Sequence, residues 1–504
     1  MAADISNIAP YNWKYLTWDT DLEIEAGNNR KHSKLPRNPL EWSPTYKTYL
    51  AVLGCIANFS TTYAGGGYTS GTSQMSDYFG VSQVAVLVGV TLYTVGFALT
   101  PMVLAPLSEL TGRRPIFLVS GVFFAIAAVC VGVTRIYTGL LLARLFLGCA
   151  NSVFAVIIVG VVADIYSGDE EKNAALALFT GGAMFGNGFG PLVSGFTAQQ
   201  LGWRWISYIL AVFVAVMVAV FAVSFGETRS DVLLRRKAHM LNTEYEEKES
   251  TQNSDVRDEH QTYPTRWYAQ ERQSAPQIIR ISLTRPMLLL FTEPIVFCFS
   301  LWAAFSWSVT YAFLIVIPYT FQVTYDMSLQ DSSAIFAAMC IAAVLMTILS
   351  YSHYRLARLC GFDTLANPEV RLYFPAVEST LVPIGLFWFG WTIRPDVPWI
   401  VPALAVGCTT MGMFSVYLAV FAYLAAAYPK EAASANAAQS MVRNLMAGGF
   451  PLFSRAMFET LGFGPACSLL GGIGILLTFV PWVLIWAGPK IRAMSKRAFG
   501  NAGD

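Results

Sequence analysis

Long apolar stretches, separated by short polar ones, run along most of this chain. A helix of roughly 20 apolar residues is long enough to cross a bilayer. Backbone polar groups within lipid must be satisfied inside the segment itself, which favours helices. The pattern therefore predicts twelve transmembrane helices, at residues 48–68, 84–107, 115–133, 139–163, 174–196, 205–225, 290–318, 332–354, 375–393, 399–427, 434–458 and 466–487.

A long polar stretch divides these segments into two groups of six. We therefore predict an all-α integral membrane protein in which two six-helix bundles pack together. The predicted regions are a cytoplasmic tail over 1–47, a first bundle over 48–225, a cytoplasmic central loop over 226–287, a second bundle over 288–487 and a cytoplasmic tail over 488–504. This spacing suggests an internal duplication, although no repeat is visible residue by residue.

The basic residues orient the chain in the membrane, because lysine and arginine concentrate in cytoplasmic loops. Of the 33 Lys and Arg residues, only Arg135, Arg204 and Arg394 fall in loops on one side, and three more fall within spans. Both tails and the central loop are therefore predicted to be cytoplasmic. The central loop has equal numbers of acidic and basic residues, which fits either a partly disordered tether or a regulatory segment.

Composition narrows the class of protein further. Hydrophobic residues make up 55% of the chain and charged residues 13%, which is about half the charged share of a soluble domain. The net charge of +1 provides no basic field for nucleic acid. The eight cysteines form no CxxC pair, and the four histidines form no metal or haem pattern. We therefore expect no nucleic-acid partner, no cofactor and no metal site.

The strongest local motif is a short cytoplasmic loop between spans 2 and 3, which reads Leu107-Ser108-Glu109-Leu110-Thr111-Gly112-Arg113-Arg114-Pro115. Gly112 permits a tight turn. Arg113 and Arg114 satisfy the positive-inside bias, and topology alone would explain them. The functional hypothesis is that Glu109 pairs with an arginine across the cytoplasmic helix ends and latches one conformation. Arg443, near the cytoplasmic side of span 11, is a candidate partner, which would make these residues a cytoplasmic gate.

Arg144 lies inside the fourth span, within Leu141-Leu142-Ala143-Arg144-Leu145-Phe146. A cation within a membrane helix is costly, and is therefore a functional candidate by default. The alternative is that its long side chain reaches the outer interface. No acidic residue falls in spans 1, 2, 3, 5 or 6, so the sequence offers Arg144 no obvious counter-charge there.

Glycine is concentrated in the fifth span, where residues 181–195 contain six glycines and Pro191. Glycine lets another helix approach closely, and proline weakens the local hydrogen-bond ladder. The segment predicts a tight, bendable helix contact, with ordinary small-residue packing as the alternative.

Polar and aromatic residues within other spans are candidates for lining a substrate cavity, although packing and lipid contact also explain them. They are Asn58, Tyr63, Trp307, Tyr311, Tyr417 and Gln439. Glu293, followed by Pro294, is expected to start the seventh helix. The chain has no phosphate-binding GxxxxGK[ST] loop and no catalytic cluster, which argues against an ATP-driven pump and against an enzyme.

These motifs resemble those of the major facilitator superfamily, and in particular its fungal branch of twelve-span drug:proton antiporters. The resemblance covers about residues 45–500. Glu109 stands in the loop between helices 2 and 3 where many members have Asp, and Ala105 stands where the general pattern has Gly. Arg144 and Gly148 match the helix-4 motif whose arginine is linked to proton coupling.

The resemblance continues in helix 5 and in several loops. The helix-5 antiporter motif is matched by Gly186, Gly190, Pro191 and Gly195, with Ser194 replacing one glycine. Residues 203–205, 226–229, 368–372 and 434–438 are similar to stretches of the fungal branch, whereas helix 1 carries Ala64-Gly65-Gly66-Gly67-Tyr68 where relatives often have proline.

The resemblance implies export of an amphiphilic organic molecule, such as a xenobiotic or a secondary metabolite, driven by inward protons. Two bundles would rock around a central cavity, with Arg144 coupling protonation to substrate release. The expected partners are a small-molecule substrate, protons and the bilayer, and the expected form is a monomer in the plasma membrane. The alternatives are uptake or vacuolar transport of a small metabolite or polyamine, and a non-transporting membrane sensor.

Overall fold

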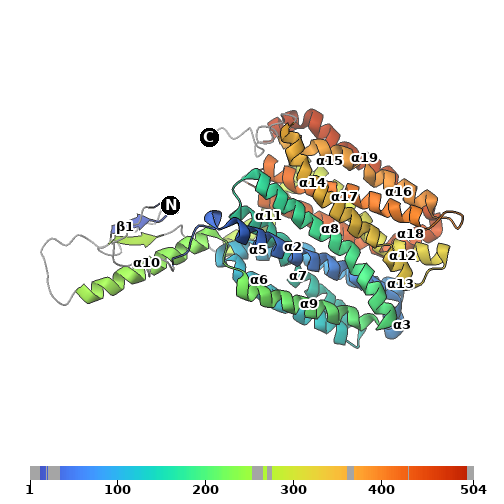
Figure 1. Ribbon diagram of the computed structural model, residues 1–504, viewed down its shortest axis with the longest axis horizontal. Helices are drawn as coiled ribbons and strands as arrows, with labels where there is room; N and C mark the ends of the chain where they lie inside the picture. Colours follow the sequence, from blue (N-terminus) through green and yellow to red (C-terminus); the bar gives the residue numbers. More distant parts are fainter. Residues whose placement is uncertain are drawn as a thin grey trace.

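The computed structural model describes residues 12–18, 20, 35–252, 265–268, 275–359, 368–428 and 431–495. Most of the predicted N-terminal tail, part of the central loop and the end of the C-terminal tail lie outside these ranges. Helices form all twelve predicted apolar segments. Figure 1 shows them packed side by side, with α10 extending away from one end of the bundle.

The first half of the chain contributes helices from α2 to α9. Their bounds are α2 Pro44–Gly66, η3 Gly67–Gly71, α3 Thr72–Phe79, α4 Gln83–Leu99, α5 Pro101–Thr111, α6 Arg113–Val133, α7 Tyr137–Ile165, α8 Asp169–Gln200 and α9 Trp203–Ser224. A short 3-10 turn, η2 (Pro39–Glu41), precedes α2. The predicted span 84–107 is divided into α4 and α5 at Pro101, which lacks the N–H that would continue the ladder.

The second half follows the same order of long helices. Their bounds are α11 Ala275–Thr292, α12 Pro294–Tyr325, α13 Leu329–Ala334, α14 Ala337–Leu359, η4 Pro368–Leu372, α15 Tyr373–Glu378, α16 Leu381–Thr392, α17 Ile400–Ala427, α18 Ala432–Leu461 and α19 Phe463–Met494. Glu293 is the N-cap residue of α12, as predicted. The ninth predicted span is split between α15 and α16, because Pro383 cannot donate to the carbonyl of Ser379.

Equivalent helices of the two halves pack in the same way. Within the halves, α2 packs on α8 as α12 packs on α18, and α6 packs on α9 as α16 packs on α19. Between the halves, α8 packs on α14 and α18 packs on α4. The predicted architecture of two helical bundles is confirmed, and the repeated pairings support the duplication that the spacing suggested.

Ten helical segments in the described part of the chain are long and apolar enough to cross a membrane. The other two predicted spans form α2 and α18, which have the lengths of spans but more polar residues. Both helices lie at the junction of the halves, where they pack on α8, α12 and α4. Their polar residues are therefore turned toward protein, which explains their lower hydropathy.

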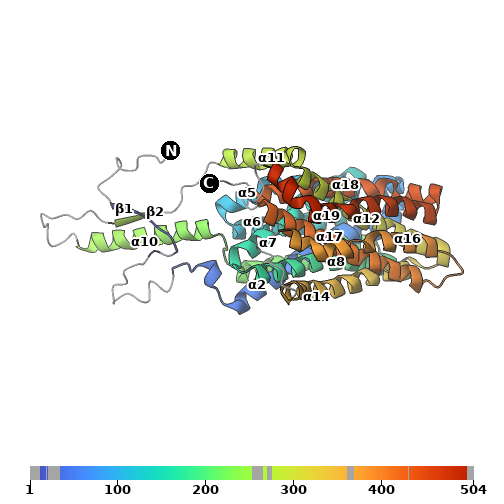
Figure 2. The ribbon, with the colours of Figure 1, turned by 90° about the horizontal axis from the view of Figure 1, so that it is seen from above.

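The described segments of the N-terminal tail and the central loop form a small structure of their own. Helix α10 (Ser230–Gln252) continues from the first bundle, and β1 (Asn12–Tyr15) pairs in parallel with β2 (Thr265–Tyr268) beside it, as Figure 2 shows. Leu16, Leu241 and Trp267 form a buried cluster with Ala238. The described part of the central loop is thus ordered and tied to the N-terminal tail, which goes beyond the tether that the sequence favoured.

Candidate functional site

Arg144 lies inside the first bundle, with only 2% of its surface exposed. Its Nε donates to the carbonyl of Gly89 at 3.2 Å and its Nη1 to that of Ala64 at 3.1 Å. The guanidinium lies over the rings of Tyr68 and Tyr93, at 4.1 and 4.6 Å from their centroids. Carbonyl dipoles and ring faces therefore solvate this cation, and the side chain does not reach the interface.

A hydrogen-bond chain holds one of these rings in place. The Tyr93 hydroxyl donates to the carbonyl of Thr61 at 2.7 Å, and Asn151 Nδ2 donates to that hydroxyl at 2.6 Å. Asn151 lies two turns from Arg144 on the same face of α7. Within the described residues, no carboxylate forms an ion pair with Arg144, and its Nη2 has no hydrogen-bond partner.

A second buried arginine, Arg443 on α18, lies among aromatic rings of the second bundle. Its guanidinium is 5.0 Å from the ring centroid of Trp307 and 4.7 Å from that of Tyr417. These two rings are stacked on each other, with centroids 5.1 Å apart. Arg443 is 3% exposed and its Nη2 donates to Ser440 at 3.2 Å. Gln439 lies one turn away from Arg443 on the same helix. Three predicted cavity residues, Trp307, Tyr417 and Gln439, therefore lie around Arg443.

The expected pairing of Glu109 with Arg443 is not formed in this structure. Arg443 lies about twelve residues into α18, deep among the rings, whereas Glu109 lies near the C-terminal end of α5. Since Arg443 is buried in the second bundle, the structure does not bring it to the cytoplasmic gate in this state.

Tyr311 connects the two arginine sites across the junction of the halves. It packs one turn from Trp307, with ring centroids 6.3 Å apart, and is 4% exposed. A Cβ atom on Gly65 would lie 2.9 Å from the Tyr311 hydroxyl and 3.3 Å from the Tyr93 ring. The missing side chain at Gly65 thus lets α12 approach α2, which gives the unusual glycine run of helix 1 a packing role.

The glycines of α8 form two stripes on opposite sides of the helix. One stripe faces α2: a Cβ on Gly186 would lie 2.7 Å from the Phe59 carbonyl oxygen, and one on Gly190 would lie 3.0 Å from that of Tyr63. The other stripe faces the second bundle, where a Cβ on Gly195 would lie 2.1 Å from Ser333 Oγ. The helix continues through Pro191. Of the antiporter-motif glycines, Gly186 and Gly190 therefore lie at a helix contact within the first half, and Gly195 lies at a contact between the halves.

Polar contacts join the halves on the side that the sequence predicts to face outward, here called the outer side. Gln199 Oε1 accepts from the backbone N–H of Gln330 at 2.7 Å, and Gln200 Nε2 donates to Gln330 Oε1 at 3.2 Å. Arg455 on α18 donates to Gln83 at the start of α4. Near the membrane centre, Thr91 donates to the carbonyl of Gly448 at 2.7 Å. The outer ends of the two halves are therefore closed in this structure.

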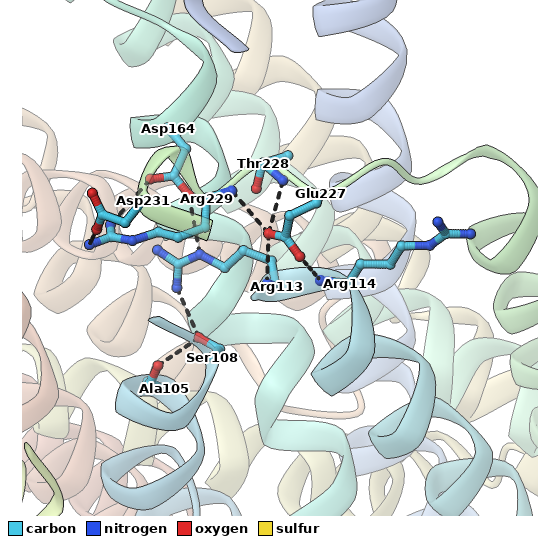
Figure 3. A network of polar contacts seen from close by, with 9 residues as sticks. All are labelled: Ala105, Ser108, Arg113, Arg114, Asp164, Glu227, Thr228, Arg229 and Asp231. Atoms are coloured by element: carbon cyan, nitrogen blue, oxygen red, sulfur yellow. Dashed lines mark hydrogen bonds and ion pairs between the residues drawn. The ribbon is translucent and has the colours of Figure 1, made fainter. Parts of the chain in front are cut away.

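Two of the predicted gate residues, Arg113 and Arg114, take part in a polar cluster at the end of the first bundle that the sequence predicts to be cytoplasmic, as Figure 3 shows. Arg113 Nε pairs with Asp164 at 3.2 Å and its Nη1 donates to Ser108 Oγ at 3.0 Å. Arg229 Nη1 lies 3.6 Å from the other oxygen of Asp164. The acid that pairs with Arg113 is thus Asp164 on α7, and Glu109 is only half-buried.

Glu227 caps the N-terminus of α6 in the same cluster. Its Oε1 accepts from the backbone N–H groups of Arg113, Thr228 and Arg229 at 2.9, 3.0 and 2.9 Å, and its Oε2 accepts from that of Arg114 at 3.2 Å. Negative charge is favourable at a helix N-terminus. Gly112 has φ +104°, and a Cβ there would lie 2.3 Å from Glu227 Oε2. The turn therefore requires glycine both for its positive φ and for the close approach of Glu227. The loop motif predicted the tight turn, but not the contact with Glu227.

We expect Glu227→Gln to destabilise the first bundle by about 1–3 kcal/mol, because part-buried hydrogen bonds to a charged carboxylate are weakened or lost. The amide oxygen could still accept, but its NH₂ group would face the Arg114 N–H. Thermal unfolding of the purified protein in detergent should show a lower midpoint. The exposed Glu171→Gln is the matched control and should leave the midpoint unchanged. Equal midpoints for both variants would contradict this role.

The second bundle has a related buried ion pair. Arg492, at the end of α19, donates to both oxygens of Glu369 at 2.9 Å, and Glu369 lies in η4, the counterpart of the loop between α5 and α6. Deeper in the bundle, Glu378 accepts from Ser415 and lies 2.9 Å from His353 Nε2. The His353 ring stacks on Phe374 at 4.6 Å.

Two further predicted cavity residues lie on α2. Asn58 Nδ2 donates to the Phe179 carbonyl of α8 at 2.9 Å, so its amide joins two helices. Tyr63, together with Arg144, lines a space of about 20 Å³, which is about the size needed for one water molecule. The structure therefore brings Tyr63 close to Arg144, whereas the amide of Asn58 is hydrogen-bonded to a neighbouring helix.

An apolar crevice of about 490 Å³ lies between the halves on α2, α8, α9 and α14. Its lining includes the first glycines of the α8 stripes, Gly181 and Gly182, and the exposed side chains of Ile56, Val344 and Ile348. Its volume falls within the range of pockets for drug-sized molecules. Because these residues lie near the middle of their helices, the crevice lies at the depth of the lipid chains.

Comparisons with known proteins agree with this architecture. A family model described as Major Facilitator Superfamily matches residues 54–451. The efflux pump FUBT of Fusarium oxysporum is 32% identical over 488 residues, which cover 96% of this chain and 77% of the relative. The ascochitine biosynthesis cluster MFS transporter of Didymella fabae is 30% identical, with 92% and 87% covered.

A solved structure has a similar fold. The proton:xylose symporter XylE, bound to 6-bromo-6-deoxy-D-glucose, superposes with a TM-score of 0.61 at 13% identity, covering 88% of this chain and 97% of that protein. At this identity the likeness concerns the fold alone.

Proposed function

We propose, from the premise that this chain belongs to the major facilitator superfamily, that it exports amphiphilic organic molecules in exchange for protons. The chain is a multi-pass membrane protein with the fold of a secondary transporter. The similar proteins named above are all transporters, and we assign no catalytic residue. The names of the relatives, an efflux pump and a transporter of a biosynthesis cluster, support export of a xenobiotic or secondary metabolite.

The observation that carries the proposal is a group of buried polar atoms without partners at the junction of the halves. Among the described residues, these include Nε and Nη1 of Arg443, both amide atoms of Gln439 and Nε1 of Trp307. Buried polar groups normally find a partner, and those that do not require an explanation. Transporters of this architecture bind substrate near the bilayer midplane between the repeats. We therefore assign this group to the substrate site.

The apolar crevice beside α8 supports an amphiphilic substrate. An amphiphile partitions into the bilayer, and would meet the crevice there without entering water. The glycines of α8 let α2 and α14, which line the crevice, pack closely against α8. A small rotation of one half against the other would thus open a path from lipid to the central site.

Proton coupling requires a group that titrates, whereas an arginine stays charged in proteins. We propose that Glu378, between His353 and Ser415, binds the proton on the cytoplasmic side of the second bundle. Arg144 would act in the other half, where it and Tyr63 line the small space inside the first bundle and its Nη2 has no partner among the described residues. Protonation of Glu378 would then remove a negative charge from the second half, while Arg144 in the first half stays positive.

An imposed pH step tests this function. In liposomes containing the purified protein, a substrate should accumulate inside only when the imposed pH step drives protons out. Glu378→Gln should reduce accumulation at least ~10-fold, as expected when the charge change at a coupling site is removed, but retain exchange of labelled for unlabelled substrate. Arg135→Gln, an exposed change on the outer side, should behave as wild type.

The alternatives give different results in the same liposomes. Accumulation of substrate inside the liposomes when the pH step drives protons in would indicate proton-coupled uptake, the first competing function. Conformational change without flux would indicate a sensor. We further propose that the protein acts as a monomer in the plasma membrane, with the vacuolar membrane as the alternative, and fluorescence microscopy of the tagged chain distinguishes these membranes.

A further inference from the structure

The surroundings of Arg443 contain more hydrogen-bond donors than acceptors. Its Nε and Nη1 have no partner among the described residues, and neither does Trp307 Nε1. Gln439, 0% exposed and one turn away on α18, also has both amide atoms without partners. The donors without partners are therefore four nitrogens, against one acceptor oxygen, that of Gln439. Such an excess of donors is suited to a negatively charged group.

Aromatic rings surround the guanidinium. Trp307 and Tyr417 lie at 5.0 and 4.7 Å from it, and Phe421 lies at 5.7 Å. Tyr417 and Phe421 meet edge to face at 4.9 Å. We call this group of Arg443, Gln439, Trp307, Tyr417 and Phe421 the Arg443 cage. Ring faces attract a cation, but they do not replace a counter-charge in a site removed from water.

The acids of the second bundle are engaged elsewhere. Glu369 pairs with Arg492, Glu378 with His353, and Glu293 accepts from Tyr428 at 3.0 Å. Within the described residues, no carboxylate lies within ion-pair distance of Arg443. An unpaired buried cation is costly. A ligand that brings a negative charge would remove this cost.

A second positive charge lies on the other side of Tyr311. Both Arg144 and Arg443 interact electrostatically with this tyrosine. Like charges at this depth repel a cationic ligand, because Coulomb interactions are strong where water is excluded. The same positive field attracts an anion. The polyamine alternative for this chain is disfavoured for the same reason.

We propose that the Arg443 cage binds the carboxylate of an amphiphilic aromatic acid. The inference deepens the proposed export function and rests on it. The carboxylate accepts from Arg443 Nε or Nη1 and from Trp307 Nε1, and Gln439 Nε2 is a further donor. The apolar, planar body of the acid packs on the rings of Tyr417 and Phe421, since stacked and edge-to-face ring contacts are favourable.

Binding of three matched probes to the purified full-length protein in nanodiscs tests the proposal. The probes are 2-naphthoate, the neutral 2-naphthamide and the cationic 2-naphthylmethylammonium, which share one ring system. We expect 2-naphthoate to bind at least ~10-fold more tightly than the amide, because charge-assisted hydrogen bonds are about twice as strong as neutral ones. The cation should bind most weakly. Calorimetric titration measures all three, and needs no transport.

Substitutions within the cage separate charge from packing. Arg443→Gln should abolish the preference for 2-naphthoate, and Arg443→Lys should retain part of it. Trp307→Phe removes one N–H and keeps a ring, so it should weaken 2-naphthoate binding and leave 2-naphthamide binding unchanged; this variant remains informative if Arg443→Gln fails to fold. Arg394→Gln, at an exposed position of the outer side, is the charge-matched control and should bind as wild type.

Equal affinity for acid and amide, a preference for the cation, or a preference that persists in Arg443→Gln would overturn the assignment. The pH-step flux assay distinguishes this failure from failure of the proposed function. Export of a neutral or cationic amphiphile without any carboxylate preference would refute the Arg443 cage alone. Absence of flux for every class of compound would refute export.

Discussion

Replacing Arg144 with alanine should abolish proton-driven export while the protein remains folded in the membrane. The guanidinium makes two hydrogen bonds to carbonyls of α2 and α4 and lies on two tyrosine rings, so it joins three helices of the first bundle. Each hydrogen bond from a charged group contributes about 1.5–3 kcal/mol. Their loss would release the Ala64 and Gly89 carbonyls and remove a positive charge from the interior of the first bundle.

The expected effect on flux is a decrease of at least ~10-fold, since 1.4 kcal/mol corresponds to tenfold in an equilibrium. Arg144→Lys should restore little, because an ammonium group cannot make the planar contacts of a guanidinium. Arg135→Ala, an exposed arginine at the outer end of the same hairpin, is the matched control. Proton-driven flux from Arg144→Ala at the rate of wild type, with equal protein in the liposomes, would exclude Arg144 from the mechanism.

Enlarging Gly448 should prevent the outer side from closing. A Cβ at this position would lie 1.9 Å from Thr94 Oγ1 and 3.4 Å from the Cα of Thr91, both on α4 of the other half. Gly448→Leu therefore inserts a wedge between α18 and α4. Overpacking costs about 1–3 kcal/mol, which would reduce the population of the closed conformation by about 5- to 150-fold. Transport should stop because the protein cannot complete its cycle.

The neighbouring Gly449 provides a sharp control, since a Cβ there meets nothing within 4 Å. Gly449→Leu has the same change in volume and hydrophobicity on the same helix turn, and should transport as wild type. Spin labels on the outer ends of α8 and α13 should show longer distances in Gly448→Leu only. If both variants gave the wild-type distance distribution, closure of the outer side would not depend on this contact.

Several features of the site could be predicted from local sequence. Arg144 was a functional candidate because a charge within a membrane helix is costly. Its side chain is buried among carbonyls and rings and does not reach the interface. The density of glycine in α8 indicated close contact, and the structure has two glycine stripes. Gly112 was expected in a tight turn and has a positive φ. In each case the prediction rests on a property of the residue itself, which is the charge of arginine or the absence of a Cβ atom in glycine.

The partners of these residues could not be predicted in the same way. Arg113 pairs with Asp164, fifty-one positions away, and not with the nearby Glu109. Glu227 accepts four backbone N–H groups, whereas the sequence offered only its place at the start of the central polar stretch and the similarity of residues 226–229 to the fungal branch. Tyr68 and Tyr93 carried no signal at all, because a tyrosine in an apolar span looks the same beside lipid as beside a cation.

The sequence by itself determined which segments form long apolar helices and that these fall into two groups of six, and it predicts which side their ends face. These properties follow from the length of apolar stretches and from the placement of charge, which act along the chain. Only the tertiary structure decided that Arg443 lies among rings and that Tyr311 reaches Gly65. Such contacts depend on how each helix is rotated about its axis and which neighbour it meets, and in a uniformly apolar span many rotations bury nearly the same surface.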